Sequence, residues 1–90
     1  MCKVKQMYSY SGKAIANQFL ITTKDKVCFQ SYDSIIAIKY FDDRRIVLDI
    51  NTWDYSQTTG KYRNIFLREL KPETQKKIDS GIYRLKNLNK

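Results

Sequence analysis

Apolar and polar residues alternate along the first half of the chain, and this period of two is typical of half-buried β-strands. The alternation runs over residues 2–10, 14–23, 27–32, 35–41 and 45–50. Polar turn residues separate these runs. Short runs rich in β-branched and aromatic residues, separated in this way, predict an antiparallel β-meander of four to five strands.

Two of these runs carry apolar residues that a strand would place on one face. Such a strand buries its apolar face and leaves the other face to solvent. Cys28 also falls in an apolar strand pattern, and we expect it to be a small core residue. The two sets are Ile15, Phe19 and Ile21 in the second run, and Ile46, Leu48 and Ile50 in the fifth.

A helical repeat replaces the alternation after Trp53. Tyr62, Ile65, Phe66 and Leu70 are spaced by three or four residues and multiples of these, so a helix would align them in one apolar stripe. This spacing predicts a helix at about 56–70 that packs across one face of the sheet. The polar residues of the segment that fall off the stripe are Lys61, Arg63, Asn64 and Arg68.

The start of this helix is rich in residues that accept hydrogen bonds from free first-turn amides. Asp54, Ser56 and Thr58 can each act as a cap, and Asp54 with Gln57 fits the spacing of a capping box. Free amides at a helix start can also bind a phosphate group. The candidate phosphate-binding residues are Thr58, Thr59 and Lys61.

The last twenty residues predict a short helix and a final strand. Pro72 suits the first position of a helix, and Gly81 suits the position just after its end. Residues 82–88 fit a strand or a helical tail, and we favour a strand because Tyr83 and Leu85 can share a face. The whole pattern predicts one α+β domain over residues 1–90.

The charge and the reactive residues argue for binding and against catalysis. Seventeen basic and nine acidic side chains give a net charge of +8, which suits an acidic or polyanionic partner or serves solubility alone. The chain has no histidine, so the usual general base is missing. Asp42 and Asp43 offer too few oxygen ligands for a hard cation and are expected at a hairpin tip. We therefore expect no enzyme, no catalytic residues, no cofactor and no metal site.

The chain carries neither a signal-peptide pattern nor an apolar run that could span a membrane. We therefore expect a reducing cytoplasm, with Cys2 and Cys28 as free thiols, and no membrane partner.

Tyrosine and arginine supply the candidate contact residues. Seven tyrosines in 90 residues are notable because a tyrosine ring is apolar and its tip is polar, which suits interfaces and base stacking. Phe19, Phe29, Trp53 and Phe66 are expected in the core. Arginine is enriched where interfaces gain most of their affinity. The candidate binding residues are Tyr32, Lys39, Tyr40, Arg44, Arg45, Lys61, Arg63 and Arg68.

Two motifs, FQSYDSIIA at 29–37 and WDYSQTTGKYR at 53–63, resemble a group of short uncharacterised proteins from phages and mobile elements of low-GC Gram-positive bacteria. The resemblance covers roughly residues 10–89. It implies a small accessory protein that modulates host machinery or blocks host defence, and by analogy an anti-CRISPR-like inhibitor. It implies no catalytic residues.

We therefore expect a non-enzymatic module that occupies a surface of a host protein or nucleoprotein. The alternative is a protein that binds DNA or RNA directly through a basic, tyrosine-rich sheet face. In that case Tyr32, Lys39, Tyr40 and the basic segment 71–90 would make the contacts.

Overall fold

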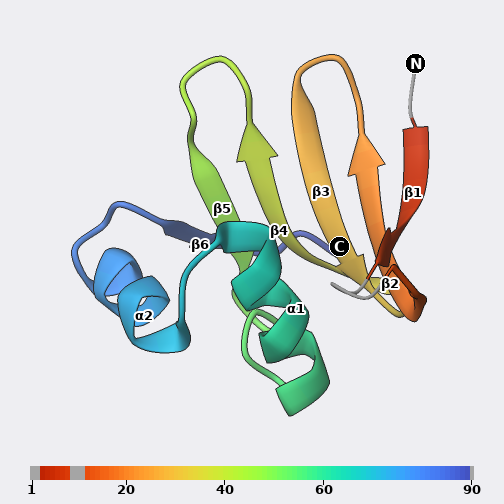
Figure 1. Ribbon diagram of the computed structural model, residues 1–90. Coiled ribbons are helices and arrows are strands. Elements are labelled where there is room, and N and C mark those ends of the chain that lie inside the picture. The colour runs from red at the N-terminus through yellow and green to blue at the C-terminus, as the bar shows by residue number, and fades with distance from the viewer. Residues whose placement is uncertain (1–2, 9–11, 90) are drawn as a thin grey trace.

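The computed structural model describes residues 3–8 and 12–89 and has an α+β fold built on one six-stranded sheet (Figure 1). Cys2 and the last residues of the first predicted strand, 9 and 10, lie outside the described residues. The strands follow one another across the sheet in sequence order. The elements are β1 (Lys3–Tyr8), β2 (Ala14–Thr22), β3 (Lys26–Ser31), β4 (Ser34–Tyr40), β5 (Ile46–Asp49), α1 (Gln57–Leu67), α2 (Lys71–Asp79) and β6 (Arg84–Lys86).

The predicted meander is confirmed with five strands, and the predicted final strand joins the same sheet as its sixth. Strands β1 to β5 are antiparallel to their neighbours, whereas β6 pairs in parallel with β5. This last strand confirms the expectation for 82–88. Between it and α1, Pro72 lies in the first turn of α2 and Gly81 follows that helix in a left-handed conformation, as predicted.

The core lies between α1 and the sheet face that α1 covers (Figure 1). Phe29 at its centre is fully buried, and its ring centroid lies 5.6 Å from that of Phe66 on α1. Trp53 and Ile78 pack at the margin of the core. The buried members of this cluster are Met7, Phe29, Ile36, Ala37, Leu48, Phe66, Leu67 and Tyr83.

The apolar face predicted for β2 is wrong in part. Asn17 takes a left-handed conformation with φ of 64°, which shifts the alternation of the side chains that follow. Leu20, opposite Phe29, therefore packs against the core, while Ile21 pairs with Cys28 on the other face. Phe19 lies on that other face as well, so it is not the core residue that we expected.

The helix α1 is shorter than predicted and ends at Leu67. Arg68 takes the left-handed position with φ of 58°, and the amides of Arg68 and Glu69 donate to the carbonyl oxygens of Ile65 and Asn64. These bonds form the usual terminating motif, with arginine where glycine is commonest. Leu70 is therefore exposed beyond the helix, and Leu67 packs in the core in its place.

Arg63 is the largest departure from the predicted helix pattern, because it is buried with only 1% of its surface exposed. Its Nη1 donates to the carbonyl oxygen of Trp53 at 2.6 Å and lies 3.2 Å from a carboxylate oxygen of Asp54. The guanidinium lies 5.2 Å from the Trp53 ring centroid. Arg63 therefore ties α1 to the loop before it and cannot serve as the surface anchor that we expected.

The end of β5 holds the C-terminal segment against the sheet face opposite α1 (Figure 1). The buried carboxylate of Asp49 accepts a hydrogen bond from the Leu88 amide at 2.7 Å. Burial alone would raise the pKa of Asp49, but this bond and others from the same turn lower it. Asn89 uses its side-chain amide to bond both backbone groups of Ile35. The prediction that Ile50 shares the buried face of this strand with Ile46 and Leu48 is wrong, because Ile50 follows the strand and is exposed.

We expect Arg63→Ala to lower the free energy of unfolding by roughly 2–4 kcal/mol, because it empties a buried site and leaves the Trp53 carbonyl unpaired. Lys61→Ala, at an exposed position of the same helix, should change it by less than about 0.5 kcal/mol. Urea unfolding followed by circular dichroism measures both. Equal losses in the two variants would contradict a structural role for Arg63.

Candidate functional site

A groove crosses the sheet on the face that carries α1. The strands extend beyond the C-terminal end of α1, so the helix covers only part of this face (Figure 1). Three depressions of about 370, 260 and 470 Å³ lie there. The first two share Met7, Leu20 and Ile65, and the last two share Lys39. We call this row of three adjoining depressions the transverse groove.

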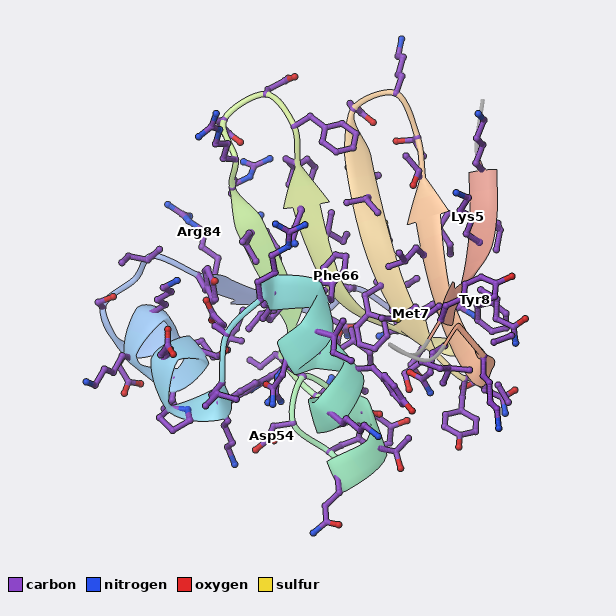
Figure 2. The ribbon with its side chains drawn as sticks, viewed as in Figure 1. Lys5, Met7, Tyr8, Asp54, Phe66 and Arg84 are labelled. Atoms are coloured by element: carbon purple, nitrogen blue, oxygen red, sulfur yellow. The ribbon has the colours of Figure 1, made fainter. Side chains whose placement is uncertain are left out.

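The transverse groove has an apolar floor and a basic rim. Glu69 is the one acidic residue among the described residues that line it. Figure 2 shows Lys5 and Met7 on β1, at one end of the groove, and Phe66 near the end of α1. The floor is formed by Met7, Leu20, Val27, Ile46 and Leu67, and the cations are Lys5, Lys39, Arg44, Arg68 and Lys77.

Lys39 lies at the centre of the groove. It is opposite Ile46 in the sheet, so it faces α1, and its Nζ donates to the carbonyl oxygen of Phe66 in the last turn of that helix. The Nζ also lies 4.4 Å from the centroid of the Phe66 ring. Burial, and then the nearby charge of Arg68, lower the pKa of Lys39, while Glu69 acts in the opposite direction. Lys39 and Arg68 are therefore neighbouring positive charges, and the negative charge of Glu69 reduces the repulsion that Lys39 experiences.

Arg44 and Arg68 line the groove from left-handed backbone positions, each with φ of 58°. A left-handed conformation costs a residue other than glycine about 1–2 kcal/mol. Neither guanidinium forms an ion pair within the part of the chain that the structure describes. Two strained positions thus hold unpaired cations, although glycine would suit the backbone better at both.

Glu69 closes the β5 end of the groove in a buried network. Its carboxylate accepts hydrogen bonds from Thr74 at 2.6 Å, Lys77 at 2.7 Å and Tyr83 at 2.8 Å. Burial would raise the pKa of Glu69, but these three donors together lower it. Burial and the hydrogen bond to Glu69 raise the pKa of Tyr83 to about 12. Among the described residues that line the groove, Glu69 is the one carboxylate, and it pairs with Lys77 rather than with Lys39, Arg44 or Arg68.

The structure brings together three of the predicted binding residues and separates the others. Lys39, Arg44 and Arg68 line the groove, whereas Tyr40 borders it with its ring on the opposite sheet face. Arg45 lies on the opposite sheet face, with its guanidinium 4.3 Å from the Tyr40 ring centroid. The remaining three are scattered: Tyr32 is exposed at the β3–β4 turn, Lys61 is exposed near the start of α1, and Arg63 is buried.

At the predicted phosphate site at the start of α1, some of the groups that would bind a phosphate already form hydrogen bonds within the chain. The Thr59 amide donates to the Ser56 hydroxyl at 3.1 Å, and its buried hydroxyl lies 3.1 Å from that of Ser31. Thr59 is therefore unavailable to a ligand, contrary to the prediction. Thr58 and Lys61 are exposed, but the carboxylate of Asp54 borders the same depression as Lys61.

Sequence reasoning missed Lys5 and Lys77 as groove residues. Lys5 and Met7 are two residues apart in β1, so the alternation that predicts the strand also places both on one face. No comparable signal marks Lys77, since its position follows from Glu69 and Tyr83, which the fold brings together.

Within the described residues, no group of three or more histidine, cysteine, aspartate or glutamate side chains could hold a metal ion. None of the described helices is long and apolar enough to cross a membrane.

Residues 2–82 match DUF8033, a family of unknown function, and the chain therefore belongs to that family. No curated protein and no solved structure shows significant similarity to it.

Arg68→Gly should raise the free energy of unfolding by about 0.5–1 kcal/mol, because relief of the left-handed strain outweighs the greater freedom of glycine in the unfolded chain. Lys61→Gly, inside α1, should lower it by about 1 kcal/mol. Urea titrations give both values. A loss of stability in Arg68→Gly would show that its side chain supports the fold.

The raised pKa of Tyr83 predicts a loss of stability at high pH. An unfolded tyrosine ionises near pH 10, so the folded state should lose stability as the pH rises from about 10 to about 12. Tyrosinate absorbance should show a step near pH 12 that Tyr83→Phe removes and that urea shifts to about 10. A step near pH 12 that persists in Tyr83→Phe would contradict the assignment.

Proposed function

We propose that this chain is a non-enzymatic binding module of a phage or mobile element, which acts in the cytoplasm of a bacterial host. It occupies an anionic surface of a host protein or nucleoprotein through the transverse groove. The observation that carries the proposal is the groove itself. Within the described residues, Lys5, Lys39, Arg44 and Arg68 line it without an ion pair, and Lys77 pairs with its one carboxylate, Glu69. Such an excess of one charge in a concave surface attracts an oppositely charged partner.

The shape of the groove favours a polymer or a surface over a small metabolite. The groove passes from β1 to β5, and adjacent strands are spaced by about 4.8 Å, so it extends over about 19 Å. Its cations occur along the whole length, from Lys5 at one end to Lys77 at the other. A partner with several negative charges in a row can satisfy all of them together.

The buried carboxylates support a binding role over catalysis. Asp49 accepts bonds from the backbone of Leu88 and from Thr52 at the end of β5. Glu69 is held by different partners, Lys77 and Tyr83, on the other face of the sheet. The two carboxylates lie in separate networks whose bonds stabilise the fold, rather than together as an acid–base pair.

The proposed setting is the suppression of host defence. The resemblance of the FQSYDSIIA and WDYSQTTGKYR segments to short proteins of phages and mobile elements supports this setting. A module that covers the anionic surface of a defence nucleoprotein would block access to it, and an anti-CRISPR-like inhibitor is one such case.

Retention on a heparin column, a polyanion, tests the groove without assuming its natural ligand. The variant is Arg44→Gly with Arg68→Gly, which removes two groove cations at positions where glycine suits the backbone. It should elute at clearly lower salt than the wild type, because fewer cations meet the polyanion.

The matched control is Lys61→Gln with Lys76→Gln, at exposed positions outside the groove. Each pair of changes removes two positive charges from the net charge of +8. If both double variants elute together, retention reflects net charge alone, and the groove is not the binding site.

A further inference from the structure

We infer that the transverse groove takes a single strand of nucleic acid, with one phosphate held between Lys39 and Arg68 and with bases against the apolar floor. The inference rests on the function proposed above and names the ligand class of the same site. It deepens the proposal because heparin retention by itself does not distinguish a nucleic acid from an acidic protein segment.

The centre of the groove is suited to a phosphate. Lys39 and Arg68 are like charges in one depression, and the charge of Arg68 lowers the pKa of Lys39. An anion between them would relieve this repulsion. Arg44 lines the adjoining depression, so the next phosphate along a strand would also meet a cation.

Two exposed aromatic residues border the ends of the groove. Tyr8, at the β1 end, is 63% exposed, and Phe41, at the β5 end, is 49% exposed. Between them, Leu20 and Val27 form an apolar floor. Unpaired bases stack on aromatic side chains, and every base offers a flat face for this contact. Cations for phosphates and aromatic residues for bases thus border one row of adjoining depressions.

An extended peptide fits the groove less well. A bound peptide strand gains affinity from hydrogen bonds to the free edge of a sheet. The groove instead crosses the face of the sheet, where β2, β3 and β4 are each paired on both sides. A peptide there would leave its own backbone amides without sheet partners, whereas a nucleic acid has no such groups.

An apolar helix face and a nucleic-acid duplex are also less suitable. A helix laid along the floor would cover Lys39 with apolar side chains and bury its charge without bringing a counterion, which is costly. A duplex keeps its bases stacked inside, so it could use the cations of the groove but not the apolar floor. A single strand uses both.

Fluorescence anisotropy with short labelled single-stranded DNA and RNA tests the inference, with the matching duplex and a polyglutamate peptide as competitors. Single strands should bind at least tenfold more tightly than the duplex or the peptide at near-physiological salt. For single strands, the logarithm of affinity falls with that of salt by about 0.7 per phosphate contact. Arg44→Gly with Arg68→Gly should therefore make this slope shallower by about 1.4.

The aromatic variants test base contacts separately from charge. Tyr8→Ala and Phe41→Ala should each weaken single-strand binding about tenfold without changing the salt slope. Tyr55→Ala is the control, because Tyr55 is 50% exposed and lies outside the groove. Circular dichroism of each variant checks that the fold is kept.

The outcomes separate the two proposals. Tight single-strand binding that depends on the arginines and on both aromatic rings supports the inference. Heparin retention that depends on the groove, combined with equal or tighter binding of duplex or polyglutamate, overturns the inference and leaves the proposed binding function intact. Retention that does not depend on the groove overturns both.

Discussion

The contact between Lys39 and the last turn of α1 joins the middle of the sheet to the end of the helix. The lysine comes from the middle of the sheet and donates to the Phe66 carbonyl oxygen, one of the acceptors that a helix end leaves free. A cation at this end also interacts favourably with the helix dipole. The chain turns away from the sheet at Arg68, so α1 leaves the apolar side chains beyond its C-terminal end uncovered.

Much of the fold follows from the sequence because its signals are local. Period-two alternation, polar turns and caps depend on neighbouring residues. Within the described residues the alternating runs correspond to observed strands, and Ser56 is the one of the three candidate caps that caps α1. The failures have non-local or conformational causes. The left-handed Asn17 reverses the alternation of β2, and the early end at Arg68 leaves Leu70 off the helix. Asparagine takes a left-handed conformation only at occasional single positions and arginine does so rarely, so neither residue type by itself predicts the conformation found here.

The candidate site was less predictable because a groove depends on how strands and helix meet. Lys39, Arg44 and Arg68 were identified as binding residues from their chemistry, without knowledge that they lie together. Arg45 and Arg63 have the same chemistry but lie elsewhere. Arg45 is on the opposite face of the sheet, beside the Tyr40 ring, and Arg63 is on the buried side of α1. Charge identifies candidates, and only register and helix rotation select among them.

The position of Lys5 has a consequence for aggregation. Strand β1 forms one edge of the sheet, and Lys3 and Lys5 are exposed along it. Unpaired strand edges recruit other chains, and lysines are a common means of preventing this. Pairing of two copies along β1 would bring their lysines together and be disfavoured by repulsion. The charge that lines one end of the groove therefore also keeps the edge strand from joining a second sheet.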